Sequence, residues 1–255
     1  MTAVPAWPPS SLPRLFVIQP LAPDATLVLD PAQSNYLVNV LRLSDGAQIK
    51  LFDGRTGEWL AELTRPHRKA TEVRVLRHLR PRETVPDLWL AFAPIKHGRL
   101  EWIVERATEL GVARIVPVVT QRTIVRTLKM ERLHAHMIEA AEQCERTALP
   151  ELAEPVALDR LLADWPENRA LLFASERGGT GSIAHPAPAA ILVGPEGGFT
   201  DEEVAAVAAH RAAHAVSLGP RILRADTACV AAVAAWMASE GDWPRPAGDV
   251  SPTAR

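Results

Sequence analysis

Short apolar runs separated by helical patterns fill the chain from residue 87 onward, and this alternation restricts the possible folds more than any other feature. The segment GRLEWIVERATELGV (98–112) has apolar residues at helical spacing and ends near a glycine, Gly111. Strands alternating with helices predict an α/β fold with a parallel sheet covered on both faces. Ligands of such sheets bind beyond the carboxyl ends of the strands. The apolar runs are DLWLAFAPI (87–95), ARIVPVVT (113–120), RALLFAS (169–175), AAILVG (189–194) and HAVSLG (214–219).

The residues before this region, 14–79, have the pattern of short strands separated by turn signals. One segment, PAQSNYLVNVLRL (31–43), has helical spacing and opens with a proline. Several short strands of this kind predict a small β-barrel. We therefore expect four parts along the chain. These are a disordered N-terminus at 1–13, a barrel domain at 14–82, an α/β domain at 83–240 and a disordered tail at 241–255.

Composition and charge limit the classes of function. The formal net charge is −2, with 47% apolar and 23% charged residues, which is ordinary for a soluble globular enzyme. A nucleic-acid partner would therefore be held by local basic patches. Cys144 and Cys229 are too few for a disulfide framework, so we expect reduced thiols in a cytoplasmic protein. The sequence has no run long enough to span a membrane, no metal-binding motif and no G-x-S-x-G of a serine hydrolase.

Two stretches are candidates for a ligand site because each joins a strand to a helix through a tight turn. In LVGPEGGFTDEEV (192–204), Thr200 and Glu203 form a capping-box pattern that predicts the start of a helix. The glycines before it indicate either a plain turn or a backbone that comes close to a ligand. Neither familiar nucleotide-binding glycine motif is present in the sequence. The second stretch, SLGPRILRADTA (217–228), has the same strand–turn–helix logic.

Basic residues follow the second turn and also form two separate runs, and an anion could bind at either place. Arg221 and Arg224 follow the second turn, where they either meet an anion or form a salt bridge, for example with Asp226. Two basic runs lie elsewhere, and each is either a solvated face or a docking surface for RNA phosphates. Their candidate RNA-binding residues are Arg65, Arg68, Lys69, Arg122 and Arg126.

The ordered set of motifs resembles the RsmE-type 16S ribosomal RNA (uracil N3) methyltransferases of the SPOUT superfamily. The resemblance rests on LVGPEGGFTDEEV, SLGPRILRADTA, KHGRLEWIVERATELGVARIVPVVTQR, EAAEQCER, RLFVIQP, VNVLRL and LFDG, and it covers the chain from Arg14 to about Ser239. It implies a PUA-like β-barrel followed by an α/β domain with a deep trefoil knot. Such a knot breaks the usual rule that chains do not thread loops.

The resemblance also implies a homodimer that takes its methyl group from S-adenosylmethionine, without a metal. Departures from the family pattern are Asn35-Tyr36 in place of a histidine pair, Glu145 in place of glycine, and Asp226 in place of glutamate. Gly194 and Leu218 are expected to give backbone contacts. The cofactor-binding residues that it implies are Phe173, Ser175, Val193, Gly194, Glu196, Gly198, Ser217, Leu218, Gly219, Ile222, Leu223 and Thr227.

Uracil N3 carries a proton, so an enzyme of this kind must stabilise the deprotonated base and align it with the methyl group. Arg221 and Arg224 are the candidate catalytic residues, with Arg14 as a further candidate from the barrel. The residues leave the general base open between Asp226 and Glu196. Two alternatives are a SPOUT enzyme that methylates a ribose 2′-hydroxyl and a non-catalytic RNA-binding module.

Overall fold

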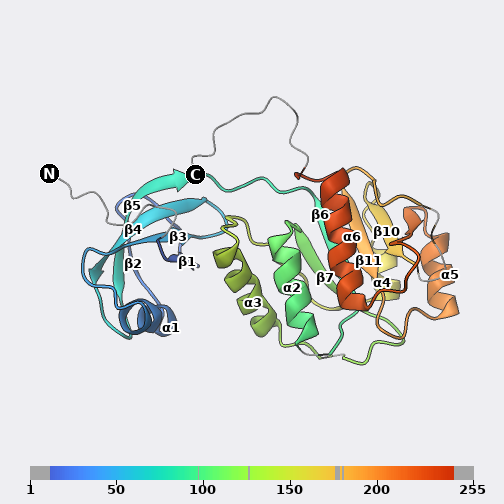
Figure 1. The fold of residues 1–255 in the computed structure, drawn as a ribbon, viewed down its shortest axis with the longest axis horizontal. Helices are drawn as coiled ribbons and strands as arrows, with labels where there is room; N and C mark the ends of the chain where they lie inside the picture. Colours follow the sequence, from blue (N-terminus) through green and yellow to red (C-terminus); the bar gives the residue numbers. More distant parts are fainter. Residues whose placement is uncertain (1–11, 97, 126, 176–178, 180, 244–255) are drawn as a thin grey trace. The chain divides into compact units, whose positions relative to one another are not determined.

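The computed structural model describes residues 12–96, 98–125, 127–175, 179 and 181–243 (Figure 1). Most of the two predicted disordered ends, 1–13 and 241–255, lies outside the described residues. The described chain divides into two compact units. The first contains residues 12–84 and a later segment, 142–148, and the second contains the remaining residues of 85–243.

The first unit is built on a five-stranded mixed sheet with the order β1-β3-β4-β5-β2. β1 pairs with β3 in parallel, and the other neighbours are antiparallel. Side chains such as Leu37, Ile49 and Val73 are fully buried in its core. The strands are β1 (Arg14–Phe16), β2 (Thr26–Val28), β3 (Gln48–Phe52), β4 (Glu58–Arg65) and β5 (Glu72–Arg80).

The predicted helical segment of this unit is present in two parts. α1 (Pro31–Asn35) starts at Asp30, whose carboxylate accepts a hydrogen bond from the backbone N–H of Gln33. A π-helical turn, η2 (Tyr36–Val40), follows directly. It ends before Arg42, whose φ of 55° lies in the left-handed region that non-glycine residues seldom adopt.

The second unit has the parallel sheet that the alternation predicted, in the order β12-β10-β11-β6-β7-β8, with β9 paired to β7. Every pairing in it is parallel. Its strands are β6 (Leu88–Phe92), β7 (Arg114–Val119), β8 (Glu151–Leu152), β9 (Val156–Ala157), β10 (Ala170–Ala174), β11 (Ala189–Val193) and β12 (Ala213–Val216). Its helices are α2 (Arg99–Glu109), α3 (Met130–Gln143), α4 (Leu158–Ala163), α5 (Asp201–Ala209) and α6 (Ala225–Ser239).

Helices cover both faces of this sheet, which explains why its central strands read as unbroken apolar runs. In β11, Ile191 packs in the core cluster that contains Trp236 of α6 and Ile103 of α2. The next residue, Leu192, packs in the opposite cluster with Val207 of α5. Both the α/β class and the parallel sheet are therefore as predicted.

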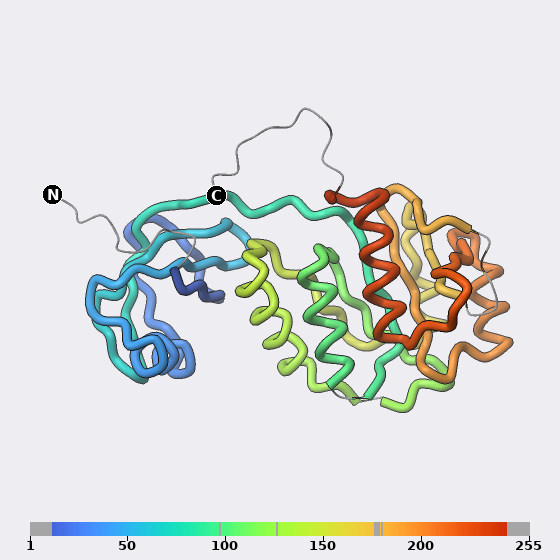
Figure 2. The backbone as a smooth tube through the Cα atoms, viewed as in Figure 1, coloured from blue at the N-terminus to red at the C-terminus, as the bar shows by residue number. Residues whose placement is uncertain are grey.

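The chain between β10 and β11, whose path Figure 2 traces, has described residues that contact the chain before and after segment 217–224. Before that segment, the N–H of Gly181 donates to the carbonyl of Ala215 in β12 at 3.2 Å. After it, the indole N–H of Trp236 in α6 donates to the carbonyl of His185 at 2.8 Å. These contacts place residues 181–185 beside the segment for which the resemblance implies a knot, and the knot itself stays a prediction.

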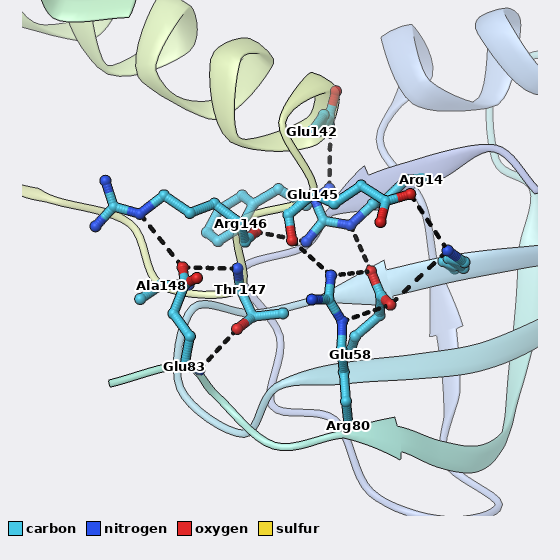
Figure 3. A network of polar contacts seen from close by, with 11 residues as sticks. Arg14, Glu58, Arg80, Glu83, Glu142, Glu145, Arg146, Thr147 and Ala148 are labelled. Atoms are coloured by element: carbon cyan, nitrogen blue, oxygen red, sulfur yellow. Dashed lines mark hydrogen bonds and ion pairs between the residues drawn. The ribbon is translucent and has the colours of Figure 1, made fainter. Parts of the chain in front are cut away.

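A buried carboxylate in the first unit binds two arginines that attach the segment 142–148 to the sheet (Figure 3). Glu58, with a side chain 3% exposed, accepts hydrogen bonds from Nε of Arg14 at 2.5 Å and Nε of Arg80 at 3.0 Å. The same two guanidinium groups donate to the carbonyls of Arg146 and Glu145, each at 2.5 Å. Each arginine therefore joins the sheet to the segment.

A second carboxylate, Glu83, holds the other end of the segment (Figure 3). It accepts the backbone N–H groups of Thr147 at 3.1 Å and Ala148 at 3.0 Å. Glu142 completes the attachment, because its carboxylate accepts the N–H of Phe16 at 2.8 Å. The first unit is therefore discontinuous in sequence.

Replacing Glu58 with glutamine should lower the free energy of unfolding by about 3 kcal/mol near neutral pH, because the buried cations lose their carboxylate. Burial by itself would raise the pKa of Glu58, but hydrogen bonds from Arg80 and Arg14 outweigh it and the pKa is lowered. A lowered folded-state pKa gives stability that is present above the ordinary glutamate pKa and is lost as the pH falls through the folded-state value. Urea unfolding of both proteins should give a stability difference that shrinks on the acid side.

The matched control is Glu62→Gln, which breaks the more exposed ion pair with Arg74. That change should cost less than about 1 kcal/mol. Equal stability of Glu58→Gln and the wild type would contradict the role given to this carboxylate.

Candidate active site

A cavity of about 290 Å³ lies at the carboxyl edge of the sheet in the second unit. Parallel neighbours end at the same edge, so the segments that follow β10, β11 and β12 meet there. The start of α6 closes the cavity with Ala225 and Ala228. Its lining from the three strand ends is Ala174, Ser175, Val193–Glu196 and Val216–Arg224.

Most of the predicted cofactor-binding residues are brought together in this lining. Those that line the cavity are Ser175, Val193, Gly194, Glu196, Ser217, Leu218, Gly219, Ile222 and Leu223. Phe173 and Gly198 line an adjoining cavity of about 90 Å³, which shares Ser175 and Gly194 with the first. Thr227 lines neither cavity. It is an exposed residue of α6 whose N–H donates to the carboxylate of Asp226 at 2.8 Å.

The glycine at the end of β11 allows an aromatic ring to approach the backbone. A Cβ on Gly194 would lie 2.9 Å from Cε2 of Phe199, closer than real Cβ atoms come. Phe199 is 9% exposed, and the turn that carries it is closed by a hydrogen bond from Gly198 N–H to the Pro195 carbonyl at 2.8 Å. The ring therefore gives a reason for glycine that does not depend on a ligand.

The capping box predicted for the next helix is confirmed at the start of α5. Thr200 accepts the N–H of Glu203 at 3.2 Å, and the Glu203 carboxylate accepts the N–H of Thr200 at 2.9 Å. Glu203 is buried, and its other oxygen accepts the N–H of Gln121 at 2.7 Å. The carboxylate thus links the end of β7 to the loop that lines the cavity.

Arg221 and Arg224 line the cavity and are exposed. Neither side chain forms a hydrogen bond or an ion pair with any residue that the structure describes. The alternative of a salt bridge to Asp226 is not found, since that carboxylate lies 3.6 Å from the guanidinium of Arg99. Two cationic groups are therefore available at the rim.

Arg14 differs from the expectation of a catalytic arginine. Its guanidinium binds Glu58 and the Arg146 carbonyl, as described above, and lies 3.7 Å from the centre of the Phe52 ring. Burial lowers its pKa, which its contact with Glu58 partly offsets. The structure therefore gives Arg14 a structural role in the first unit. The sequence could not reveal this because the partners lie far along the chain.

The predicted RNA-binding residues occupy different environments. Arg68 and Lys69 are exposed on the turn between β4 and β5, whereas Arg65 forms an ion pair with Glu72 at 2.9 Å. Arg122 donates to two loop carbonyls in the second unit, and Arg126 lies outside the described residues.

One of the departures from the family pattern, Glu145, has a local explanation. Glu145 has a φ of 61°, a conformation that favours glycine, which accounts for the residue usual in the family. Its backbone is bound by Arg80, and its carboxylate lies 3.7 Å from the Lys50 ammonium. Asn35 accepts a hydrogen bond from Asn39 at 2.7 Å, and the neighbouring Tyr36 is 42% exposed.

The described residues also bear on metal binding, thiol reactivity and membrane insertion. Within the described ranges, no group of three or more His, Cys, Asp or Glu is placed to hold a metal ion. Cys144 and Cys229 are not joined by a disulfide, and burial raises the pKa of the Cys229 thiol, which disfavours its reactive thiolate. None of the helices in the described part of the chain has the length and hydropathy of a membrane span.

Comparison with known protein families identifies the class of protein to which the chain belongs. Residues 82–237 match the RNA methyltransferase domain family, and residues 29–76 match the RNA methyltransferase PUA domain family. The two matches follow one another along the chain, as in an RNA methyltransferase with an N-terminal PUA domain.

Individual relatives narrow this class. Ribosomal RNA small subunit methyltransferase E of Rickettsia conorii is 32% identical over 87% of this chain and 93% of that protein. The protein of the same name from Synechocystis is 36% identical over 87% of this chain and 76% of that protein. The Neisseria gonorrhoeae enzyme of this name, solved bound to S-adenosyl methionine, has a TM-score of 0.84 and 30% identity and covers 91% of this chain and 100% of that one. The chain belongs to the ribosomal RNA small subunit methyltransferase E family, which confirms the predicted family and fold class.

Several lining residues were not singled out by the sequence analysis. Pro195 and Pro220 lie inside the two quoted motifs, so their position between predicted residues was an available signal. Ala174, Ala225 and Ala228 carry no chemical signal in the sequence. Only the topology places these alanines beside the cavity.

Adding a methyl group at Gly194 should destabilise the protein by about 1–3 kcal/mol, because the new Cβ overlaps the Phe199 ring. Replacing the ring with a smaller side chain, in the double variant Gly194→Ala/Phe199→Leu, should remove part of this overlap. The double variant should then lose less stability than the sum of the two single variants in urea unfolding. Strictly additive losses would show that the two residues do not conflict.

Proposed function

We propose that this chain transfers the methyl group of S-adenosylmethionine to N3 of a uridine in 16S ribosomal RNA. The observation that carries the proposal is one cavity formed by three strand ends, with two arginines at its rim whose side chains have no partner among the described residues. Membership of the ribosomal RNA small subunit methyltransferase E family supports the substrate and the cofactor. The cytoplasm is the proposed location.

The residues of the cavity fit a neutral nucleoside joined to an amino acid. Leu218 and Leu223 offer apolar surface, while Gly219, where an added Cβ would meet no atom within 4 Å, leaves the backbone open to a ligand. Glu196 places a carboxylate on the same wall, where a positively charged group can lie. S-adenosylmethionine bound here would supply an activated methyl group.

The chemistry requires that the proton at uracil N3 leave before or as the nitrogen attacks. Negative charge then spreads onto the two uracil oxygens, and cations placed beforehand stabilise it. Arg221 and Arg224 are proposed for this role because no described residue neutralises them. Of the two candidate proton acceptors, Glu196 lines the cavity, whereas Asp226 lies beside Arg99. We therefore favour Glu196.

The first unit is proposed to contact the RNA backbone through the β4–β5 turn. The N–H of Thr71 donates to the Ser34 hydroxyl at 2.9 Å, so this turn is fastened to α1. Arg68 and Lys69 are exposed there, and their side chains have no hydrogen-bond or ion-pair partner among the described residues, which leaves them available for phosphates.

A homodimer is proposed through the packed pair α2 and α6. Trp102 of α2 is 39% exposed, a large apolar side chain on a helix surface. α6 is apolar on nearly all sides. Its exposed positions 235 and 238 carry alanine, not a charged residue. A helix that is apolar on every side is typical of one that is covered.

The deciding experiment is to incubate the protein with S-adenosylmethionine and small ribosomal subunits, then digest the RNA and identify the modified nucleoside by mass spectrometry. We expect 3-methyluridine. A 2′-O-methylated nucleoside would instead establish the ribose-directed alternative. A protein that binds RNA but shows no heat on titration with S-adenosylmethionine would be the non-catalytic module.

Alanine at Arg221 or Arg224 should lower the single-turnover rate about a hundredfold, as expected for loss of one preorganised donor. The affinity for S-adenosylmethionine should change little, because the stabilised charge develops only during the reaction. Lysine should restore the rate in part, since it keeps the charge without the planar fork. If affinity and rate fall together, the arginine forms the pocket instead.

Removing Arg68 and Lys69 together should weaken RNA binding and flatten its salt dependence. Each lost phosphate contact should reduce the log–log slope by about 0.7 to 0.9. Arg65→Ala should have a smaller effect, because Arg65 is already paired with Glu72. Arg211→Ala, which affects an exposed pair with Glu167, is the control. An unchanged slope in the double variant would mean that this turn is only solvated.

A further inference from the structure

We propose that Arg122 is a positioning residue that holds the cavity loop 194–200 in shape, and that it is not an RNA contact. The inference rests on the proposed cofactor site. By sequence alone, Arg122 belongs to a basic run. The inference is based on the hydrogen bonds between the turn 120–123 and the loop 194–200.

The turn that carries Arg122 is itself fixed. The N–H of Thr120 donates to the hydroxyl of Thr123 at 2.9 Å, and the N–H of Thr123 donates to the Thr120 carbonyl at 3.2 Å. Both threonines are buried, at 3% and 4% exposure. The turn follows β7, so its base is part of the sheet. Arg122 therefore projects from a rigid platform.

One nitrogen of Arg122 makes both contacts with the loop. Nη1 donates to the carbonyl of Gly197 at 2.7 Å and to the carbonyl of Phe199 at 3.3 Å. The aliphatic stem lies along Gly197, where an added Cβ would be 3.5 Å from Cδ of Arg122. The guanidinium thus bridges two carbonyls on either side of Gly198.

A second bond joins the same turn to the same loop. The N–H of Gln121 donates to the buried Glu203 carboxylate, which also holds the N–H of Thr200. Arg122 and Glu203 therefore fix the middle and the end of the loop. The beginning of this loop, Gly194 to Glu196, lines the cavity. Loss of either contact should let that wall move.

Charge-assisted hydrogen bonds are stronger than neutral ones, so Arg122 should matter more than an ordinary surface arginine. Its effect on the cofactor is indirect, because the side chain lines the adjoining cavity and not the main one. The expected result of its loss is a weaker ligand complex, since the ligand must then order the loop.

The test compares Arg122→Met, which keeps the stem without a donor, with Arg122→Lys, which keeps one donor. Because both bonds come from a single nitrogen, lysine should retain affinity for S-adenosylmethionine within about threefold. Methionine should weaken it about tenfold, equivalent to about 1.4 kcal/mol. Arg160→Met is the control, because Arg160 is exposed and pairs only with Asp164 of its own helix region. The affinities are measured by calorimetry without RNA.

A purely structural role would lower the melting temperature of Arg122→Met and leave the dissociation constant unchanged, which would overturn the proposal. An RNA role would instead lower RNA affinity and its salt slope with the same constant, which would also overturn it. Should the wild type not bind S-adenosylmethionine, the proposed function fails by itself. The role of Arg122 in holding the loop is then tested by amide hydrogen exchange at residues 196–200, which must be faster in Arg122→Met than in Arg122→Lys.

Discussion

The parallel pairing of β12, β10 and β11 is the constraint on which the candidate site depends. Leu172 of β10 is opposite Ile191 of β11 on one side and His214 of β12 on the other, so the three strands run level with one another. Their carboxyl ends consequently lie at one edge. Segments that are far apart in sequence are thereby brought to a single cavity.

The loops that meet at this edge are held in different ways, and the difference suits the proposed chemistry. The loop 194–200 is fixed from behind by Arg122 and Glu203, and Phe199 packs beneath Gly194. The segment 217–224 instead carries cations whose side chains have no partner in the described chain. A rigid wall favours binding of a ligand, and in the proposed function these cations, which no described residue neutralises, stabilise the charge that appears in the transition state.

Arg99 helps to keep Arg221 and Arg224 without a carboxylate partner, because it lies beside Asp226. The carboxylate is only two residues from Arg224 in sequence, so it was the obvious partner for the arginines. It lies 3.6 Å from the Arg99 guanidinium instead, and it also accepts the N–H of Thr227. An acid that is already satisfied competes less for Arg221 and Arg224, which keeps these two cations available for a substrate anion.

The sequence predicted features that depend on neighbouring residues and missed those that depend on distant ones. The strand–helix alternation, the Thr200 capping box and the turn after β11 all follow from local spacing, and all are present. Charge gave less information, because a basic residue looks the same whether it is solvated or bound. Arg14 meets Arg146, 132 residues away, and Arg122 meets Gly197, 75 residues away. No local pattern predicts either contact.

The segment 142–148 shows the same limit at the level of domains. Its first residues continue the helical pattern of α3, so the sequence assigns the whole segment to the α/β domain. The contacts of Glu58, Glu83 and Glu142 place it in the first unit. A fragment ending near residue 84 would retain Arg14 and Arg80 but lose the two carbonyls to which they donate. The sheet and this segment therefore belong to one compact unit, so the proposed RNA binding by the first unit should be measured on the full chain.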